Sequence, residues 1–79
     1  MKHKYDVKFD AAAIFDYFGG VAATCEMLKS VGIEISHRVL QKQRERNGIT
    51  ASVVASILLA SIRAGEPIDL KNFLIEREK

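Results

Sequence analysis

The chain has 79 residues, of which 48% are hydrophobic and 28% charged, and twelve basic against ten acidic residues leave a net charge of +2. That length has room for one hydrophobic core and therefore for one domain. The balanced charge and the high apolar fraction together exclude an intrinsically disordered chain. No apolar stretch reaches the roughly 20 residues of a membrane span. A single cysteine, Cys25, excludes an internal disulfide framework. We therefore expect a cytoplasmic domain without a signal peptide.

Residues 2–9 alternate between polar and apolar side chains, which predicts a short extended arm. Tyr5, Val7 and Phe9 fall on one side of this arm. Two uses of it remain open: its lysines could reach a phosphate or a groove of a nucleic acid, or its apolar side could pair as a strand across a dimer. We favour packing, because three apolar side chains would otherwise be exposed.

Glycine divides the next part of the chain into two helical segments. Asp10 is a suitable N-cap for a first helix over residues 11–18, which Gly19 and Gly20 end. A second helix is expected over residues 21–31, followed by Gly32 in a left-handed C-terminal position. Its apolar face comprises Val21, Cys25, Leu28 and Val31.

A third helix is expected between the N-cap Ser36 and Asn47-Gly48. Its periodicity places Val39, Leu40 and Gln43 inward. Residues 36–47 carry four basic side chains against one acidic one, a net charge of +3, whereas residues 11–35 carry −2. A basic helix face is typical of proteins that bind the phosphate backbone of nucleic acids. A solvated, charged surface helix is the alternative explanation.

A fourth helix is predicted from the N-cap Thr50 to about Ala64, and it is apolar nearly all round. Such a helix must be buried nearly all round, and a partner subunit could supply part of that burial. After Pro67, a fifth helix with a stripe of apolar side chains is expected. The predicted dimer contacts are Leu58, Leu59, Ile62, Phe73 and Leu74. The expected fold is thus all-α, a compact five-helix domain with an extended N-terminal arm.

The third helix also carries side chains that suit base edges. Arginine pairs with guanine and glutamine with adenine in the major groove. His37, Arg38, Gln41 and Lys42 lie on its predicted outer face near its start, the part that enters the major groove in a helix-turn-helix protein. The preceding helix and its glycine-containing turn would supply the other half of that motif.

Three sequence motifs resemble the Cro-like and lambda-repressor-like helix-turn-helix regulators of phages. They are Tyr17-Phe18-Gly19-Gly20-Val21-Ala22-Ala23, then Gly32-Ile33, and Ile35-Ser36 followed by Gln41-Lys42-Gln43-Arg44-Glu45-Arg46-Asn47-Gly48-Ile49. The resemblance covers about residues 14–60 and is nearest to filamentous-phage immunity repressors. It implies a homodimeric transcriptional repressor that binds a palindromic operator on double-stranded DNA in a bacterial host.

The resemblance also implies roles for individual residues. The base-contacting positions correspond to Ser36, His37, Arg38, Gln41 and Lys42. The backbone-contacting positions correspond to Thr24, Gln43, Arg44 and Arg46. We expect a single DNA-binding domain over residues 1–79. It comprises an N-terminal arm over residues 1–9, the helix-turn-helix over residues 21–47, and core and dimerisation helices over residues 50–75. Three departures from the family pattern are the long connection between Leu28 and Ser36, Gln43 in place of a tryptophan, and Thr50 in place of a proline.

Other function classes find no support in the sequence. His3 and His37 lack further ligands at metal-binding spacing, and the P-loop residues do not follow Gly19-Gly20. Cys25 is expected to be a buried structural thiol. We therefore expect no enzyme activity, metal, cofactor, membrane contact or small-molecule ligand. The alternative to a repressor is a protein-interaction adaptor or an antitoxin-like helical module.

Overall fold

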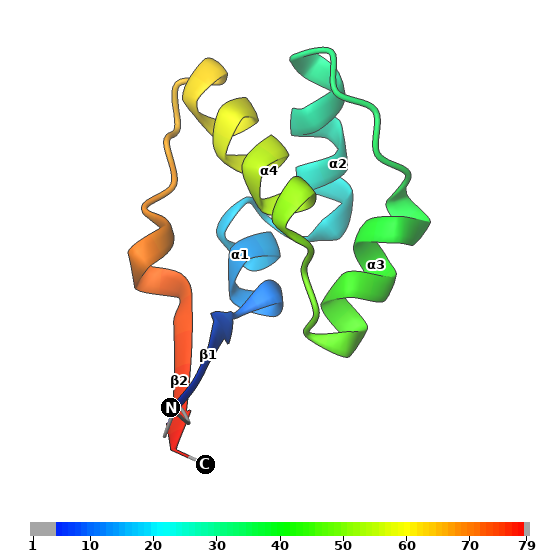
Figure 1. Cartoon of the computed structure of the whole chain (residues 1–79). Coiled ribbons are helices and arrows are strands. Elements are labelled where there is room, and N and C mark those ends of the chain that lie inside the picture. The colour runs from blue at the N-terminus through cyan, green and yellow to red at the C-terminus, as the bar shows by residue number, and fades with distance from the viewer. Residues whose placement is uncertain (1–4, 79) are drawn as a thin grey trace.

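The computed structural model describes residues 5–78, with the side chains of residues 7–75. Its elements are β1 (Tyr5–Phe9), α1 (Ala11–Tyr17), α2 (Val21–Ser30), α3 (His37–Arg46), α4 (Ala51–Arg63), the 3-10 helix η1 (Leu70–Phe73) and β2 (Leu74–Glu78). The four α-helices pack together, and the two strands lie side by side at one end of the molecule (Figure 1). The structure is mostly helical, but the predicted five-helix, all-α architecture is wrong.

The four predicted helices are confirmed, and three of them begin at the N-cap residue that the sequence predicts. The side-chain oxygens of Asp10, Ser36 and Thr50 each accept a hydrogen bond from the backbone N–H three residues further on, over 3.1, 3.2 and 3.4 Å. Each bond satisfies an N–H that the first turn of a helix leaves unpaired. Gly32, with φ of +85°, ends the turn after α2 in the predicted left-handed conformation.

The predicted fifth helix is replaced by the single turn of η1 and by strand β2. The latter runs antiparallel to β1, with Val7 opposite Glu76 and Phe9 opposite Leu74. The N–H of Asp10 also donates to the carbonyl of Phe73 over 2.7 Å, which joins the strand pair to the start of α1. A helix this short is marginal in isolation, whereas the strand pairs its backbone groups with β1. The described part of the N-terminal arm, β1, therefore pairs with β2 of its own chain.

The hydrophobic core lies among α1, α2, α3 and α4. Its buried members are Ala11, Ile14, Phe15, Val21, Cys25, Leu28, Leu40, Val53, Ile57, Ala60 and Ile68. Burial of Cys25 and Leu28 confirms the predicted inner face of α2. By length and composition, no single helix among the described residues could cross a membrane, and only α1 and α2 together, bent by 64°, pass that test.

Candidate nucleic-acid interface

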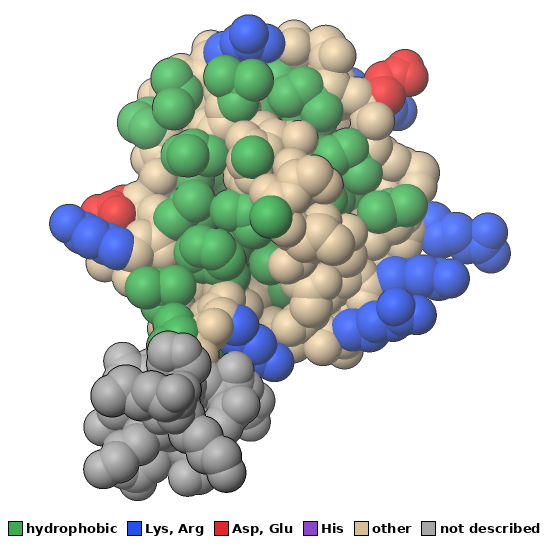
Figure 2. Space-filling model, in the orientation of Figure 1, with side chains coloured by type: hydrophobic (Ala, Val, Ile, Leu, Met, Phe, Trp, Pro, Cys, Tyr) green, Lys and Arg blue, Asp and Glu red, His purple; other side chains and the backbone are tan. Residues whose placement is uncertain are grey.

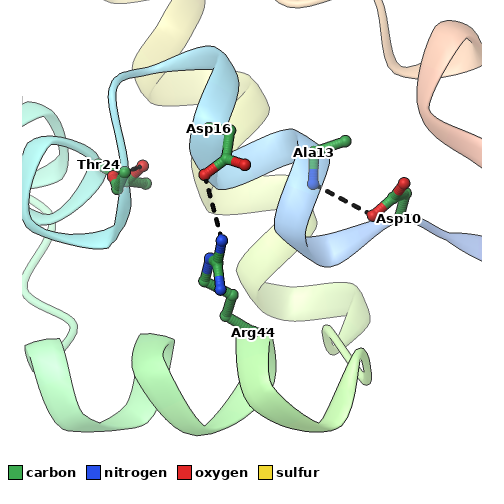
Figure 3. A network of polar contacts seen from close by, with 6 residues as sticks. Asp10, Ala13, Asp16, Thr24 and Arg44 are labelled. Atoms are coloured by element: carbon green, nitrogen blue, oxygen red, sulfur yellow. Dashed lines mark hydrogen bonds and ion pairs between the residues drawn. The ribbon is translucent and has the colours of Figure 1, made fainter.

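α3 is fastened to the helical body by side chains near its C-terminal end. The guanidinium group of Arg44 lies 3.4 Å from the carboxylate of Asp16 on α1 (Figure 3). Asn47, in the left-handed conformation with φ of 50°, accepts a hydrogen bond of 2.8 Å from the N–H of Ala11 at the start of α1. Leu40, fully buried, packs into the core from the inner face of α3. These contacts fix which face of α3 is turned to solvent.

The outer face of α3 carries a basic row, which we define as Arg38, Lys42 and Arg46. The three side chains are exposed and recur every four residues, on the side of the helix away from Leu40. In Figure 2 lysine and arginine side chains gather over α3. Within the part of the chain that the structure describes, no member of the basic row has an ion-pair partner. The row therefore presents free positive charge along one side of the molecule.

The acidic side chain on α3, that of Glu45, is engaged with a neighbour. Its carboxylate accepts a hydrogen bond of 3.0 Å from the side-chain amide nitrogen of Gln41. A carboxylate only accepts hydrogen bonds, so the NH2 group of Gln41 must be the side that faces Glu45. The amide oxygen and the second N–H of Gln41 stay available, which are the two groups that recognise the N6 and N7 positions of adenine.

The structure brings the predicted base-contacting residues together on the first two turns of α3. His37, Arg38 and Lys42 are exposed, and Gln41 is half-buried. The hydroxyl of Ser36 is also exposed, but it already accepts the capping hydrogen bond from Val39. The predicted base-contacting side chains therefore form one cluster at the N-terminal end of α3.

Val39 is a candidate contact that the sequence prediction missed. It was expected to point inward, yet 43% of the residue is exposed. Neighbouring positions on a helix are about 100° apart, so Leu40, which takes the inward direction, turns Val39 to the side. An apolar side chain on this face is suited to the methyl group of thymine. The helical spacing of Leu40, Gln43 and Asn47 defines the inner face of α3, and this spacing is the signal in the sequence that places Val39 outside that face.

The predicted backbone-contacting residues are placed less favourably. Thr24 is fully buried on α2, and its hydroxyl donates to the carbonyl of Gly20 over 2.8 Å, so it is removed from the candidate interface (Figure 3). The amide oxygen of Gln43 accepts a hydrogen bond from the N–H of Thr50 over 3.0 Å, and Arg44 is paired with Asp16 as described. Of the four predicted residues, Arg46 belongs to the exposed basic row.

The predicted dimer residues lie on three elements. On α4, Leu59 and Ile62 are 42% and 56% exposed, whereas Leu58 is half-buried against the core. On β2, Leu74 is 49% exposed. Phe73, at the end of η1, is half-buried, with its ring centre 5.7 Å from that of Tyr17. The apolar side chains open to solvent are thus chiefly those of α4 and the strand pair.

A hollow of about 480 Å³ lies beside the start of α3, lined by Cys25, Lys29, Glu34, Ile35, Ser36 and His37. The thiol of Cys25 donates to the carbonyl of Ile35 over 3.4 Å, and this cysteine is buried, as predicted. No set of three metal-ligating side chains converges within the described residues. His3 lies outside them.

Comparison of the chain with known proteins finds no match among family models, curated proteins or solved structures. The functional interpretation therefore depends on the geometry and chemistry of α3 itself.

Proposed function

We propose that this protein is a sequence-specific, double-stranded DNA-binding transcriptional repressor of the phage type. It would bind a palindromic operator as a homodimer, with α3 in the major groove. The observation that carries the proposal is the basic row of Arg38, Lys42 and Arg46, which is exposed, aligned and free of ion pairs within the described residues. It lies on a helix whose opposite face is anchored to α1 and to the core.

The arrangement of charge on α3 favours this proposal over a merely solvated helix. Surface helices commonly pair glutamate with lysine or arginine at spacings of three or four residues. On α3 the glutamate, Glu45, bonds instead to Gln41, and the basic side chain nearest the core, Arg44, pairs with α1. The remaining positive charge is left for an external anion, for which the phosphates of a duplex are suited.

Residues near the start of α3 would contact bases, and residues further along it would contact phosphates. Arg38 and Gln41, near the start of the helix, would read base edges, with arginine suited to guanine and glutamine to adenine. Lys42 and Arg46, one and two turns further on, would contact phosphates, which fix the position of a protein on the duplex without reading its sequence. In a dimer, two such helices would enter successive major grooves roughly 34 Å apart.

The proposal is tested by titrating fluorescent duplexes with wild-type protein and with single alanine variants. Arg38→Ala is expected to weaken binding to the preferred sequence by about 1–3 kcal/mol and to relax the preference, whereas Lys42→Ala should weaken all sequences and lower the salt slope by about 1. The control for loss of charge alone is Lys71→Ala, which removes one positive charge from η1, across the molecule from α3 (Figure 1). Lys71 is exposed and lies 3.7 Å from the carboxylate of Asp69.

Two outcomes would contradict the proposal. If Arg38→Ala and Lys42→Ala bind DNA as the Lys71→Ala control does, α3 is not the reading helix. If the wild-type protein binds all duplexes weakly and equally, the adaptor or antitoxin-like interpretation is favoured. That second interpretation draws support from the exposed Leu59 and Ile62 on α4, which also suit a protein partner.

A further inference from the structure

The solvent side of α4 (Ala51–Arg63) has an unusual composition for an exposed helix face. Its exposed positions include four residues that we call the α4 seam: Ser52, Ala55, Leu59 and Ile62. A surface helix ordinarily carries charged side chains on its outer face, yet α4 has none before Arg63. In Figure 2 hydrophobic side chains gather on this face of the molecule, apart from the basic side chains over α3.

The spacing of the α4 seam is that of a helix–helix contact. Its members are separated by three, four and three residues, the pattern by which helices pack side by side in coiled coils. The opposite face of α4 already packs into the core through Val53, Ile57 and Ala60. The seam is therefore a second packing face that has no partner among the described residues.

The order of small and large residues along the seam indicates which partner fits it. Ser52 and Ala55 are small and lie in the first half of α4, whereas Leu59 and Ile62 are large and lie in the second half. The four positions are placed symmetrically about position 57. A two-fold rotation that sets α4 antiparallel to a second α4 therefore brings each small residue opposite a large one, and a two-fold contact must be self-complementary in this way.

We propose that the α4 seam is the docking surface for a second copy of this chain, with the two α4 helices antiparallel. Ala55 then packs against the partner's Leu59, and Ser52 against the partner's Ile62. This proposal rests on the proposed function, because it names the surface through which the proposed repressor forms its homodimer. The exposed basic side chains over α3 lie apart from the α4 seam in Figure 2, so this pairing leaves them free.

The surface area that the α4 seam can bury limits the affinity of the dimer. A helix of 13 residues is about 20 Å long, and one such helix pair covers less than the roughly 800 Å² per partner of a standard stable interface. We therefore expect free dimers to dissociate in the micromolar range. Two half-sites on one duplex hold the copies near each other and raise their effective concentration, so the dimer is stronger on DNA.

The test exchanges the small and large positions of the seam and measures dimerisation of the full chain by sedimentation equilibrium. Ala55→Leu sets two large side chains against each other, and Leu59→Ala leaves a gap, so each single variant should raise the dimer dissociation constant about tenfold or more. The double variant Ala55→Leu/Leu59→Ala restores a large residue opposite a small one and should return to within about threefold of wild type. Circular dichroism checks that each variant is folded.

The control is Val7→Ser, which removes an exposed apolar side chain from β1 and should leave the dissociation constant unchanged. Wild-type protein that sediments as a monomer up to near-millimolar concentration overturns the proposal. So does a double variant as impaired as the two singles together, or single variants that dimerise like wild type.

A parallel titration with duplex DNA separates this proposal from the proposed function. Rescue of dimerisation by the double variant, in a protein that does not bind DNA, supports the α4 pairing and contradicts the repressor. Sequence-specific DNA binding by a protein that stays monomeric supports the role of α3 and overturns the α4 pairing.

Discussion

Asn47 joins the end of α3 to the start of α1. Replacing it by different residues separates the contribution of its side-chain hydrogen bond to stability from that of its backbone conformation. Its backbone has φ of 50°, in the left-handed region, and its side-chain oxygen accepts a 2.8 Å hydrogen bond from the N–H of Ala11. Ala11 is fully buried, so an N–H left unpaired there loses a protein acceptor where water has little access. Asn47→Gly removes the acceptor alone, because glycine adopts the left-handed conformation freely.

The magnitudes follow from these two effects. Leaving the Ala11 N–H without its partner should cost about 1–3 kcal/mol in Asn47→Gly. Asn47→Ala loses the same bond and, relative to the glycine variant, adds about 1–2 kcal/mol, because alanine has a Cβ atom and lacks the polar side chain with which asparagine tolerates the left-handed conformation. Asn47→Asp keeps an acceptor oxygen beside the positive end of α1, so its free energy of unfolding should stay within about 0.5 kcal/mol of wild type.

Urea denaturation followed by circular dichroism measures this series, provided that the slope of the free energy with urea is the same for all variants. The expected order of stability is wild type and Asn47→Asp, then Asn47→Gly, then Asn47→Ala. A glycine variant as stable as wild type would show that the bond between α3 and α1 contributes nothing. Equal stability of the glycine and alanine variants would refute the argument from backbone conformation.

Three further predictions concern the core and the anchoring of α3. Ile57→Ala, at a fully buried position on α4, should destabilise by about 2–5 kcal/mol in the same assay, and a loss below about 1 kcal/mol would place it outside the core. Ser61→Ala removes a buried hydroxyl that accepts from the N–H of Ile68 over 3.2 Å, so it should cost about 1–3 kcal/mol. Ser56→Ala is its matched control, with a hydroxyl bonded only within its own helix, and similar losses for the two variants would contradict that role. Arg44→Ala breaks a largely solvent-exposed ion pair and should cost less than about 1 kcal/mol, and a larger loss by urea denaturation would contradict this estimate.

The four helices could be predicted because their signals are local. The caps Asp10, Ser36 and Thr50 act on N–H groups three residues away, and the same short range governs the periodic burial within each helix. Strand β2 could not be predicted in this way, because its hydrogen-bond partners on β1 come from the opposite end of the chain. Apolar spacing over a few residues does not distinguish a short helix from a strand that has a distant partner.

The same distinction applies to the candidate interface. The outward direction of Arg38, Lys42 and Arg46 follows from helical spacing around Leu40 and is visible in the sequence. The engagement of Arg44 depends on Asp16, which belongs to another helix and is brought near only by folding. Thr24 is buried, although the sequence prediction makes it a contact to the DNA backbone. The sequence does contain a signal for this burial, because Thr24 follows Val21 by three residues and therefore lies on the inner face of α2.

The most direct test of the central claim is selection of bound sequences from random double-stranded DNA by the wild-type protein. We expect enrichment of a palindromic motif whose half-sites are about 10–10.5 base pairs apart, the distance between successive major grooves on one side of a duplex. Arg38→Ala should select a motif that has lost its preference at a symmetric pair of positions. Absence of any enriched sequence, or an enriched motif that Arg38→Ala leaves unchanged, would contradict the assignment of α3 as the reading helix.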